Sequence, residues 1–244
     1  MKKKFNQVRK RGFKYAFQSL AYKLQDHFFD LKYGTDTGGK IWTPKVAISV
    51  DYLEKGRSYK ATRLKPIHTV LNELSLSREL PFVDVGSGKG RVLLLAMEYG
   101  FQKITGIEYS GALCKIAEEN VRAYQKRTGS AADIRIYEMD ATRYEFEGEE
   151  SVLYLFNPLN HAGMEVFFYN VQRSLEAHDR ELWIIYNNPK HGEFMKSLDF
   201  LEEHRIFILE GEKVVVYLHQ PYPKTAFGGV EDQQLRLPII LMQA

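Results

Sequence analysis

A short apolar segment that runs into three glycines is the part of this sequence best suited to hold a ligand. It is PFVDVGSGKGRVLLLA, residues 81–96, in which Asp84 precedes glycines at positions 86, 88 and 90. The apolar residues before the glycines predict a strand, and those after them predict a helix. Because glycine lets the backbone approach a ligand closely, this strand–loop–helix pattern predicts a binding loop.

Two phosphate-binding loops fit this segment poorly. The triphosphate loop G-x-x-x-x-G-K-[ST] needs a glycine where Val83 stands and a hydroxyl side chain where Gly90 stands. The dinucleotide loop G-x-G-x-x-G matches at its first two glycines, but Arg91 takes the third position and weakens the close packing of helix on strand. Since Glu108 ends the next predicted strand, a partner for the adenosine half of a ligand is still present.

Polar residues also follow the later predicted strands. EMDATRY places Asp140 and Ala141 after the third strand, LYLFNPLN places Asn157 and Pro158 after the fourth, and IYNNP ends the fifth. In sheets built from alternating strands and helices, ligands bind at the carboxyl ends of the strands. We therefore expect these residues to lie at the same site as the glycine loop.

The motif D-x-G-x-G-x-G at residues 84–90, followed by the acids of GIEYS and EMDATRY and the Asn-Pro of LYLFNPLN, resembles the class I S-adenosylmethionine-dependent methyltransferases in order and spacing. The resemblance covers roughly residues 66–220. It implies S-adenosyl-L-methionine as the cofactor, with one acid on the ribose hydroxyls and another beside the adenine. The implied cofactor contacts are Asp84, Gly86, Ser87, Gly88, Gly90, Glu108, Tyr109, Asp140, Ala141 and Asn157, and the implied catalytic pair is Asn157 and Pro158.

A narrower resemblance involves four segments, YGTDTGG, VDVGSGKGRVLLLA, FNPL and IYNNP. Together they are similar to a group of bacterial methyltransferases of unassigned substrate, which is distantly similar to the non-SET histone lysine methyltransferases. In those relatives, segments before the glycine loop fold over the cofactor. The resemblance therefore implies that YGTDTGG, residues 33–39, and the loop around Tyr59 and Thr62 form a lid.

Strands and helices alternate after residue 81, which predicts an α/β fold with a doubly wound, mostly parallel sheet. The expected strands are 82–85, 103–108, 134–137, 152–156 and 181–186, and a tight turn near Gly211 predicts a terminal antiparallel hairpin. This is the seven-stranded Rossmann-like pattern of the methyltransferases, preceded by a helical and loop extension. We expect residues 1–65 to be a basic N-terminal extension and lid, 66–220 the methyltransferase domain, and 221–244 a C-terminal tail.

The N-terminal extension is strongly basic. Residues 1–40 carry ten Lys or Arg and three Asp, a net charge of +7, whereas the remainder carries 24 basic and 28 acidic residues. Residues 13–29 place apolar side chains three and four apart, which predicts an amphipathic helix whose apolar face is Phe13, Ala16, Phe17, Leu20, Ala21, Leu24 and Phe28. We expect this face to dock on the main domain. An anionic partner for residues 1–14, whether RNA, DNA or anionic lipid, is the alternative.

The composition argues against a transmembrane protein and against a metal-binding protein. The longest apolar run, VLLLAM, is far shorter than the roughly 20 residues that span a bilayer, so no transmembrane segment is expected. The single cysteine, Cys114, predicts a reducing cytoplasm. The expected strand ends offer three amides, at positions 157, 187 and 188, and no carboxylate, while the histidines lack paired ligand spacing; we therefore expect no metal.

The sequence thus predicts an S-adenosylmethionine-dependent methyltransferase that transfers a methyl group by in-line displacement. The expected acceptor is a nitrogen, with a protein lysine among the candidates, although protein, RNA and small-molecule acceptors all stay open. One alternative is an RNA methyltransferase that uses the basic N-terminus. A second is a protein that binds the cofactor without catalysis, and a third is a protein tethered to a membrane surface by residues 1–29.

Overall fold

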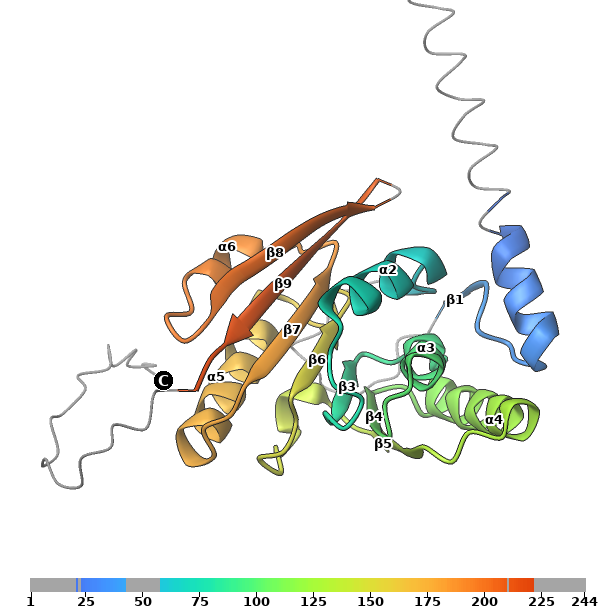
Figure 1. Cartoon of the computed structure of the whole chain (residues 1–244), viewed down its shortest axis with the longest axis horizontal. Helices are drawn as coiled ribbons and strands as arrows, with labels where there is room; N and C mark the ends of the chain where they lie inside the picture. Colours follow the sequence, from blue (N-terminus) through green and yellow to red (C-terminus); the bar gives the residue numbers. More distant parts are fainter. Residues whose placement is uncertain (1–20, 22, 43–57, 210, 222–244) are drawn as a thin grey trace, which may run out of the picture.

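A seven-stranded sheet forms the centre of the molecule (Figure 1). The structure, a computed structural model, describes residues 21, 23–42, 58–209 and 211–221. The sheet has the order β5-β4-β3-β6-β7-β9-β8. Its strands are β3 (Phe82–Val85), β4 (Lys103–Glu108), β5 (Asp133–Glu138), β6 (Val152–Leu155), β7 (Leu182–Asn187), β8 (Glu202–Leu209) and β9 (Glu212–His219). The first five strands are parallel, and β8 and β9 form an antiparallel hairpin against β7.

The order of the strands reverses beside β3. From β3 the chain adds β4 and β5 on one side, and it then crosses back to add β6 and β7 on the other. All four residues of β3 and of β6 are buried, which explains why these two strands are apolar almost throughout. The carboxyl ends of β3, β4 and β6 therefore meet at the point where doubly wound sheets bind their ligands.

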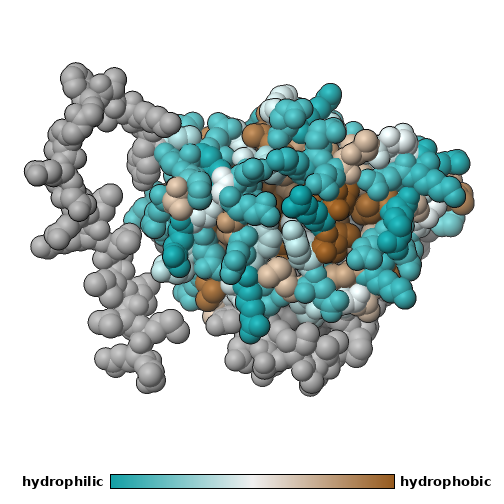
Figure 2. Space-filling view, turned by 90° about the horizontal axis from the view of Figure 1, so that it is seen from below, coloured by the Kyte–Doolittle hydropathy of each residue, from teal (hydrophilic) through white to brown (hydrophobic). Residues whose placement is uncertain are grey.

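Helices cover both faces of the sheet. One face carries α2 (Leu64–Leu74), α3 (Arg91–Tyr99) and α4 (Gly111–Thr128), and the other carries η1 (Ala141–Arg143), α5 (His161–Ala177) and α6 (Gly192–Lys196). Alternate residues of β3 enter the two cores, since Phe82 packs with α3 and Val83 packs with α5. The outer surface differs from this interior: the face shown in Figure 2 is mostly hydrophilic, with apolar residues confined to small patches.

The N-terminal helix docks on the main domain, as the sequence predicted, but with a different face. Residues 23–33 are helical and lie beside α4 at one end of the molecule (Figure 1). Phe29 and Tyr33 are buried there, and the ring of Tyr33 lies 4.5 Å from that of Tyr124. The predicted apolar face is wrong in its described part, because Leu24 is 47% exposed and Phe28 is 63% exposed. Ala21, also on that face, is half-buried, and residues 13, 16, 17 and 20 lie outside the described residues, as does the basic leader.

The starts of two helices differ in how they are capped. Ser110 precedes α4, yet its side chain makes no capping hydrogen bond. Helix α5 begins at His161, where the side chain of Asn160 accepts a hydrogen bond from the Gly163 backbone N–H and so caps it. In the extension, β1 (Lys40–Trp42) and β2 (Ser58–Lys60) form a small antiparallel pair that the sequence did not predict, since three-residue strands are too short to show a periodic pattern.

Adjacent phenylalanines test how the N-terminal helix docks. Phe29→Ala removes a ring that is buried in the core shared by the N-terminal helix and the main domain, so we expect it to lower the free energy of unfolding by about 3 kcal/mol. Phe28→Ala removes an exposed ring and should change the free energy of unfolding by less than about 0.5 kcal/mol. Urea unfolding of the full chain measures both values, and equal effects of the two substitutions would contradict the docking orientation.

Candidate functional site

A cavity of about 290 Å³ opens at the carboxyl ends of β3, β4 and β6. Most of the residues predicted to bind the cofactor or to act in catalysis line it, namely Asp84, Gly86, Ser87, Gly88, Glu108, Tyr109, Asn157 and Pro158. Three of the predicted contacts do not line it. Gly90 lies one residue before α3, Asp140 caps η1 through hydrogen bonds from Thr142, and Ala141 is buried in the core under α5.

Positive backbone φ angles shape the glycine loop. Gly86 has φ 79° and Gly88 has φ 55°, which are values that favour glycine. A Cβ atom on Gly86 would lie 2.9 Å from the Cβ of Pro158, so the loop passes too close to the turn after β6 to carry a side chain there. The glycines therefore bring two of the three strand ends into direct contact.

Glu108 connects the loop to the end of β4. Its two carboxylate oxygens accept hydrogen bonds from the backbone N–H groups of Gly88, at 2.9 Å, and Ser110, at 3.0 Å. Burial raises the pKa of the Glu108 carboxyl, and these backbone donors lower it in part. Each carboxylate oxygen can accept more than one hydrogen bond, so Glu108 retains capacity to bind two hydroxyl groups of a ligand.

Asp84 is the most unusual group in the cavity wall. It is 2% exposed and makes no hydrogen bond with the part of the chain that the structure describes. Burial, and then the nearby Glu108 carboxylate, raise the pKa of Asp84 well above its ordinary value. A buried carboxylate without a partner costs stability, so a ligand that donates hydrogen bonds or carries positive charge would stabilise the ionised form of Asp84.

Asn157 is used within the protein. Its side-chain oxygen accepts hydrogen bonds from the Tyr186 hydroxyl at 2.8 Å and from the Lys190 backbone N–H at 2.9 Å. Its side-chain nitrogen donates to the carbonyl of Asn188 at 2.7 Å. The amide oxygen therefore holds the turns after β6 and β7 together and has both lone pairs engaged. The structure brings Asn157 and Asn188 together as expected, and a direct catalytic role for Asn157 or Pro158 stays a prediction.

Two cavity-lining residues that the sequence did not single out as contacts connect the sheet with the extension. Tyr154, in β6, is 1% exposed, and its hydroxyl lies 3.2 Å from the Thr62 hydroxyl and 3.1 Å from the Asn187 side-chain nitrogen. Burial raises the pKa of Tyr154, so this phenol stays protonated. Tyr154 appears in the sequence only as part of an apolar strand, and nothing there indicates that its hydroxyl faces a cavity.

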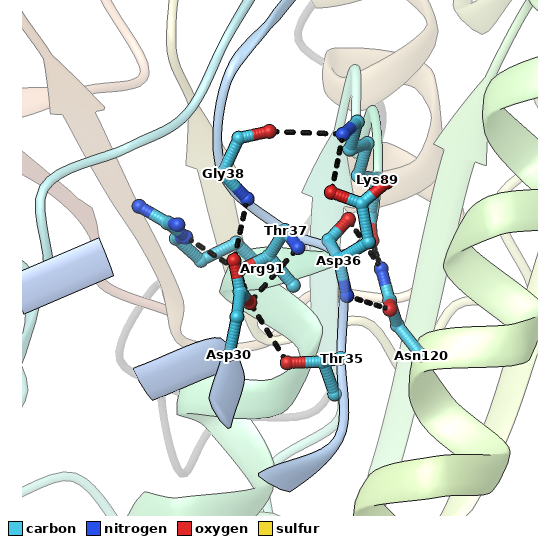
Figure 3. Close-up of polar contacts among 8 residues, drawn as sticks. All are labelled: Asp30, Thr35, Asp36, Thr37, Gly38, Lys89, Arg91 and Asn120. Atoms are coloured by element: carbon cyan, nitrogen blue, oxygen red, sulfur yellow. Dashed lines mark hydrogen bonds and ion pairs between the residues drawn. The ribbon is translucent and has the colours of Figure 1, made fainter. Parts of the chain in front are cut away.

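The segment YGTDTGG lies against the helix side of the glycine loop, where Lys89 and Asn120 hold it (Figure 3). The Lys89 ammonium is 4% exposed and donates to the Asp36 carboxylate and to the Gly38 carbonyl, both at 2.9 Å. The Asn120 side chain accepts from the Asp36 backbone N–H and donates to the carbonyls of Asp36 and Lys89. The Lys89 side chain is therefore directed toward this segment. A lysine that binds a phosphate in the cavity would be directed into the cavity instead.

Arg91 makes a second connection to the extension, and the sequence did not reveal it. Its buried guanidinium pairs with Asp26, donates to the Thr37 hydroxyl at 2.9 Å and donates to the Thr62 carbonyl at 3.1 Å. The carboxylate of Asp30 accepts hydrogen bonds from the backbone N–H groups of Thr37 and its neighbour Gly38, which fixes the same turn (Figure 3). The sequence contained one indication of this contact. An arginine at the first position of an otherwise apolar, buried helix needs an acidic partner.

Neither a metal-binding cluster nor a membrane-spanning helix is found in the part of the chain that the structure describes. Residues 23–42 and 58–221, apart from position 210, contain no group of three or more His, Cys, Asp or Glu side chains that could hold a metal ion. No helix in the same part of the chain is long and apolar enough to cross a membrane.

Comparisons with known proteins agree with this arrangement. Residues 55–167, a little under half of the chain, match the family model of the histone methylation protein DOT1. No curated protein matches the chain significantly. The structure is similar to the Escherichia coli protein yhhF, assigned as a methyltransferase, with a TM-score of 0.51 and 16% identity over 75% of this chain and 100% of that one.

A second similar structure is an RNA methyltransferase from Salinibacter ruber in complex with S-adenosyl-L-homocysteine. It has a TM-score of 0.47 and 21% identity over 66% of this chain and 95% of that one. The similarity to the Escherichia coli protein and the order of the strands show that this chain has the Rossmann-like class I methyltransferase fold. The family resemblance and the fold class predicted from the sequence are thereby confirmed.

The raised pKa of Asp84 predicts a specific dependence of stability on pH. Because its folded-state pKa lies above the ordinary value of 3.8, the contribution of Asp84 to stability falls as pH rises from about 4 through that folded-state pKa. Asp84→Asn cannot ionise, so we expect its free energy of unfolding to exceed the wild-type value by about 1 kcal/mol or more at neutral pH. The gain should shrink toward pH 4.

Urea unfolding at a series of pH values measures this difference. The matched control is Asp199→Asn, which replaces an exposed aspartate and should change the free energy of unfolding by less than about 0.5 kcal/mol. A wild-type protein that stays more stable than Asp84→Asn at neutral pH would show that Asp84 is paired rather than isolated.

Proposed function

We propose that this chain, which has the class I methyltransferase fold, binds S-adenosyl-L-methionine beside the glycine loop and transfers its methyl group to an acceptor. The observation that carries the proposal is the pair of buried carboxylates, Asp84 and Glu108, in the cavity wall. Burial raises the pKa of both, so a positively charged ligand stabilises their ionised forms. S-adenosylmethionine carries a sulfonium and an ammonium, and it has no phosphate.

The residues present fit this cofactor. Glu108 can accept hydrogen bonds from two ribose hydroxyls in addition to the backbone donors that it already binds. Asp84, which has no partner among the described residues, is placed to receive the ammonium side. The glycine loop offers a close backbone surface, and its one lysine, Lys89, is bound to the segment YGTDTGG instead of facing a phosphate.

The protein's part in the reaction is to position two reactants and to exclude water. The sulfonium supplies a methyl group that is already activated, and the acceptor's lone pair displaces the sulfur, which keeps the bonding electrons. Asn157 holds the turns after β6 and β7 at the edge of the cavity where an acceptor would approach. Tyr154 and Thr62 connect β6 to the extension, so the lid predicted from the sequence has an anchor beside the cavity.

A nitrogen acceptor, with a protein lysine as the leading candidate, is our proposal for the substrate. It is supported by the DOT1 family match and by the side chains that line the cavity near Asn188, which are amides and lysines instead of a carboxylate set that could hold magnesium. The engaged oxygen of Asn157 argues against recognition of a planar amino group by that side chain. The alternatives are an RNA acceptor that binds the basic N-terminus and cofactor binding without transfer.

Calorimetry tests the cofactor. We expect the full chain to bind S-adenosylmethionine and not NAD, and Glu108→Gln to weaken that binding at least about tenfold because a charged hydrogen-bond acceptor is lost. Glu119→Gln, which replaces an exposed glutamate of α4, should bind as the wild type does. If the wild-type chain fails to bind S-adenosylmethionine, the proposal is wrong.

Labelling tests the acceptor. The full chain is incubated with tritiated-methyl S-adenosylmethionine and a cell lysate, and portions are then treated with protease or with RNase. We expect label that protease releases and RNase does not, with methylated lysine after hydrolysis. Label released by RNase would contradict the lysine acceptor in favour of RNA, and label that resists both treatments would indicate a small molecule or lipid. Cofactor binding without any label would contradict catalysis.

A further inference from the structure

The N-terminal helix presents an apolar stripe to the outside of the molecule. Leu24, Phe28 and Leu31 are spaced four and three residues apart, so they lie on one side of the helix. They are 47%, 63% and 69% exposed, and they are half of the six large apolar side chains that stand exposed in the described part of the chain. An exposed, contiguous apolar stripe indicates an interaction surface, whereas scattered exposed residues do not.

Contacts on the opposite side of this helix fix its orientation. Phe29 and Tyr33 are buried against the main domain, and the Arg91 guanidinium pairs with Asp26. The Asp30 carboxylate holds the turn that follows the helix (Figure 3). Rotating the helix to bury the apolar stripe would break all of these contacts and would leave the Arg91 charge buried without its partner, which is costly. The stripe therefore faces outward because the helix is docked.

Exposed lysines stand on the same helix as the stripe, and the sequence that precedes it is basic. Residues 1–20 contain seven Lys or Arg and no Asp or Glu, and Lys23 and Lys32 are exposed on the helix itself. In the sequence, the apolar spacing continues backward from Leu24 through residues 20, 17 and 13. A helix with Leu and Phe on one side and lysines around it is typical of segments that lie in the interface of an anionic membrane.

We propose that the outer face of this helix binds an anionic lipid surface and brings the catalytic domain to it. Other occupants fit less well. A second copy of the chain would bring two segments of net charge +7 together, and nothing in residues 1–20 is acidic enough to compensate. The bases of single-stranded RNA stack on aromatic rings, and two of the three residues of the stripe, Leu24 and Leu31, are not aromatic. Only a surface that is both apolar and anionic matches both properties.

Vesicle flotation tests the proposal with the full chain. We expect binding to vesicles that mix phosphatidylglycerol with phosphatidylcholine, at least about tenfold weaker binding to pure phosphatidylcholine, and weaker binding as salt rises. The double variant Phe28→Ser with Leu31→Ser should lower binding to the anionic vesicles at least about tenfold, because its apolar contact area is lost. Replacing Arg9, Lys10 and Arg11 by Gln should lower binding by a similar factor.

The chain provides a matched control for the double variant. Tyr169 and Ile208 are 61% and 69% exposed, nearly the same as Phe28 and Leu31, but they belong to α5 and β8. Tyr169→Ser with Ile208→Ser should bind vesicles as the wild type does. All of these variants should bind S-adenosylmethionine as the wild type does, which separates this test from the proposed activity.

Three outcomes would overturn the proposal. The first is unchanged vesicle binding by Phe28→Ser with Leu31→Ser. The second is salt-sensitive binding of the wild type to RNA without binding to anionic vesicles. The third is a wild-type dimer that the same double variant converts to monomer while vesicles are not bound. Comparable thermal unfolding of the variant and its control keeps these outcomes free of folding effects.

Discussion

The backbone of residues 86–88 is held between the end of β4 and the turn after β6, and this constraint determines where the rest of the site lies. The N–H groups of Gly86 and Ser87 donate to the Ile107 carbonyl, at 2.8 and 3.0 Å, and that of Gly88 donates to Glu108. On the other side, Gly86 lies so close to Pro158 that a Cβ atom would clash. The loop is thus the point at which β3, β4 and β6 are joined, and the cavity is the space left beside it.

Two residues at the end of the glycine loop connect it to the N-terminal extension. Lys89 and Arg91 are both buried charges, and each pairs with an aspartate of the segment 26–38. Because a buried charge without a partner costs several kcal/mol, the docked position of the N-terminal helix is part of the stability of the glycine loop. The extension is therefore an integral support of the site, although none of its strands belongs to the seven-stranded sheet.

Negative charges at the cavity and positive charges on the N-terminal helix lie in two different environments. The carboxylates of Asp84 and Glu108 are buried at the cavity, where low solvent exposure makes their ionised forms costly and favours a cationic ligand. The lysines of the N-terminal helix are exposed, where charge costs little and acts over a Debye length, about 8 Å at physiological ionic strength. The proposed cofactor site and the proposed lipid-binding face thus rest on separate groups, and the pair Arg91–Asp26 connects α3 with the N-terminal helix.

The sequence alone determined the glycine loop, the order of strands and helices, and the polar residues at the strand ends, because each is encoded by neighbouring residues with a local periodicity. Glu108 and Asn157 were found in this way. Only the tertiary structure decided what these residues contact and how the N-terminal helix docks. The buried side of that helix is not its most regular apolar face but the side that carries Tyr33 and Asp26, whose partners Tyr124 and Arg91 lie far away in the chain. A local pattern shows which side chains favour burial. Which face of the helix is buried in the end depends on specific contacts that exist only in the assembled fold.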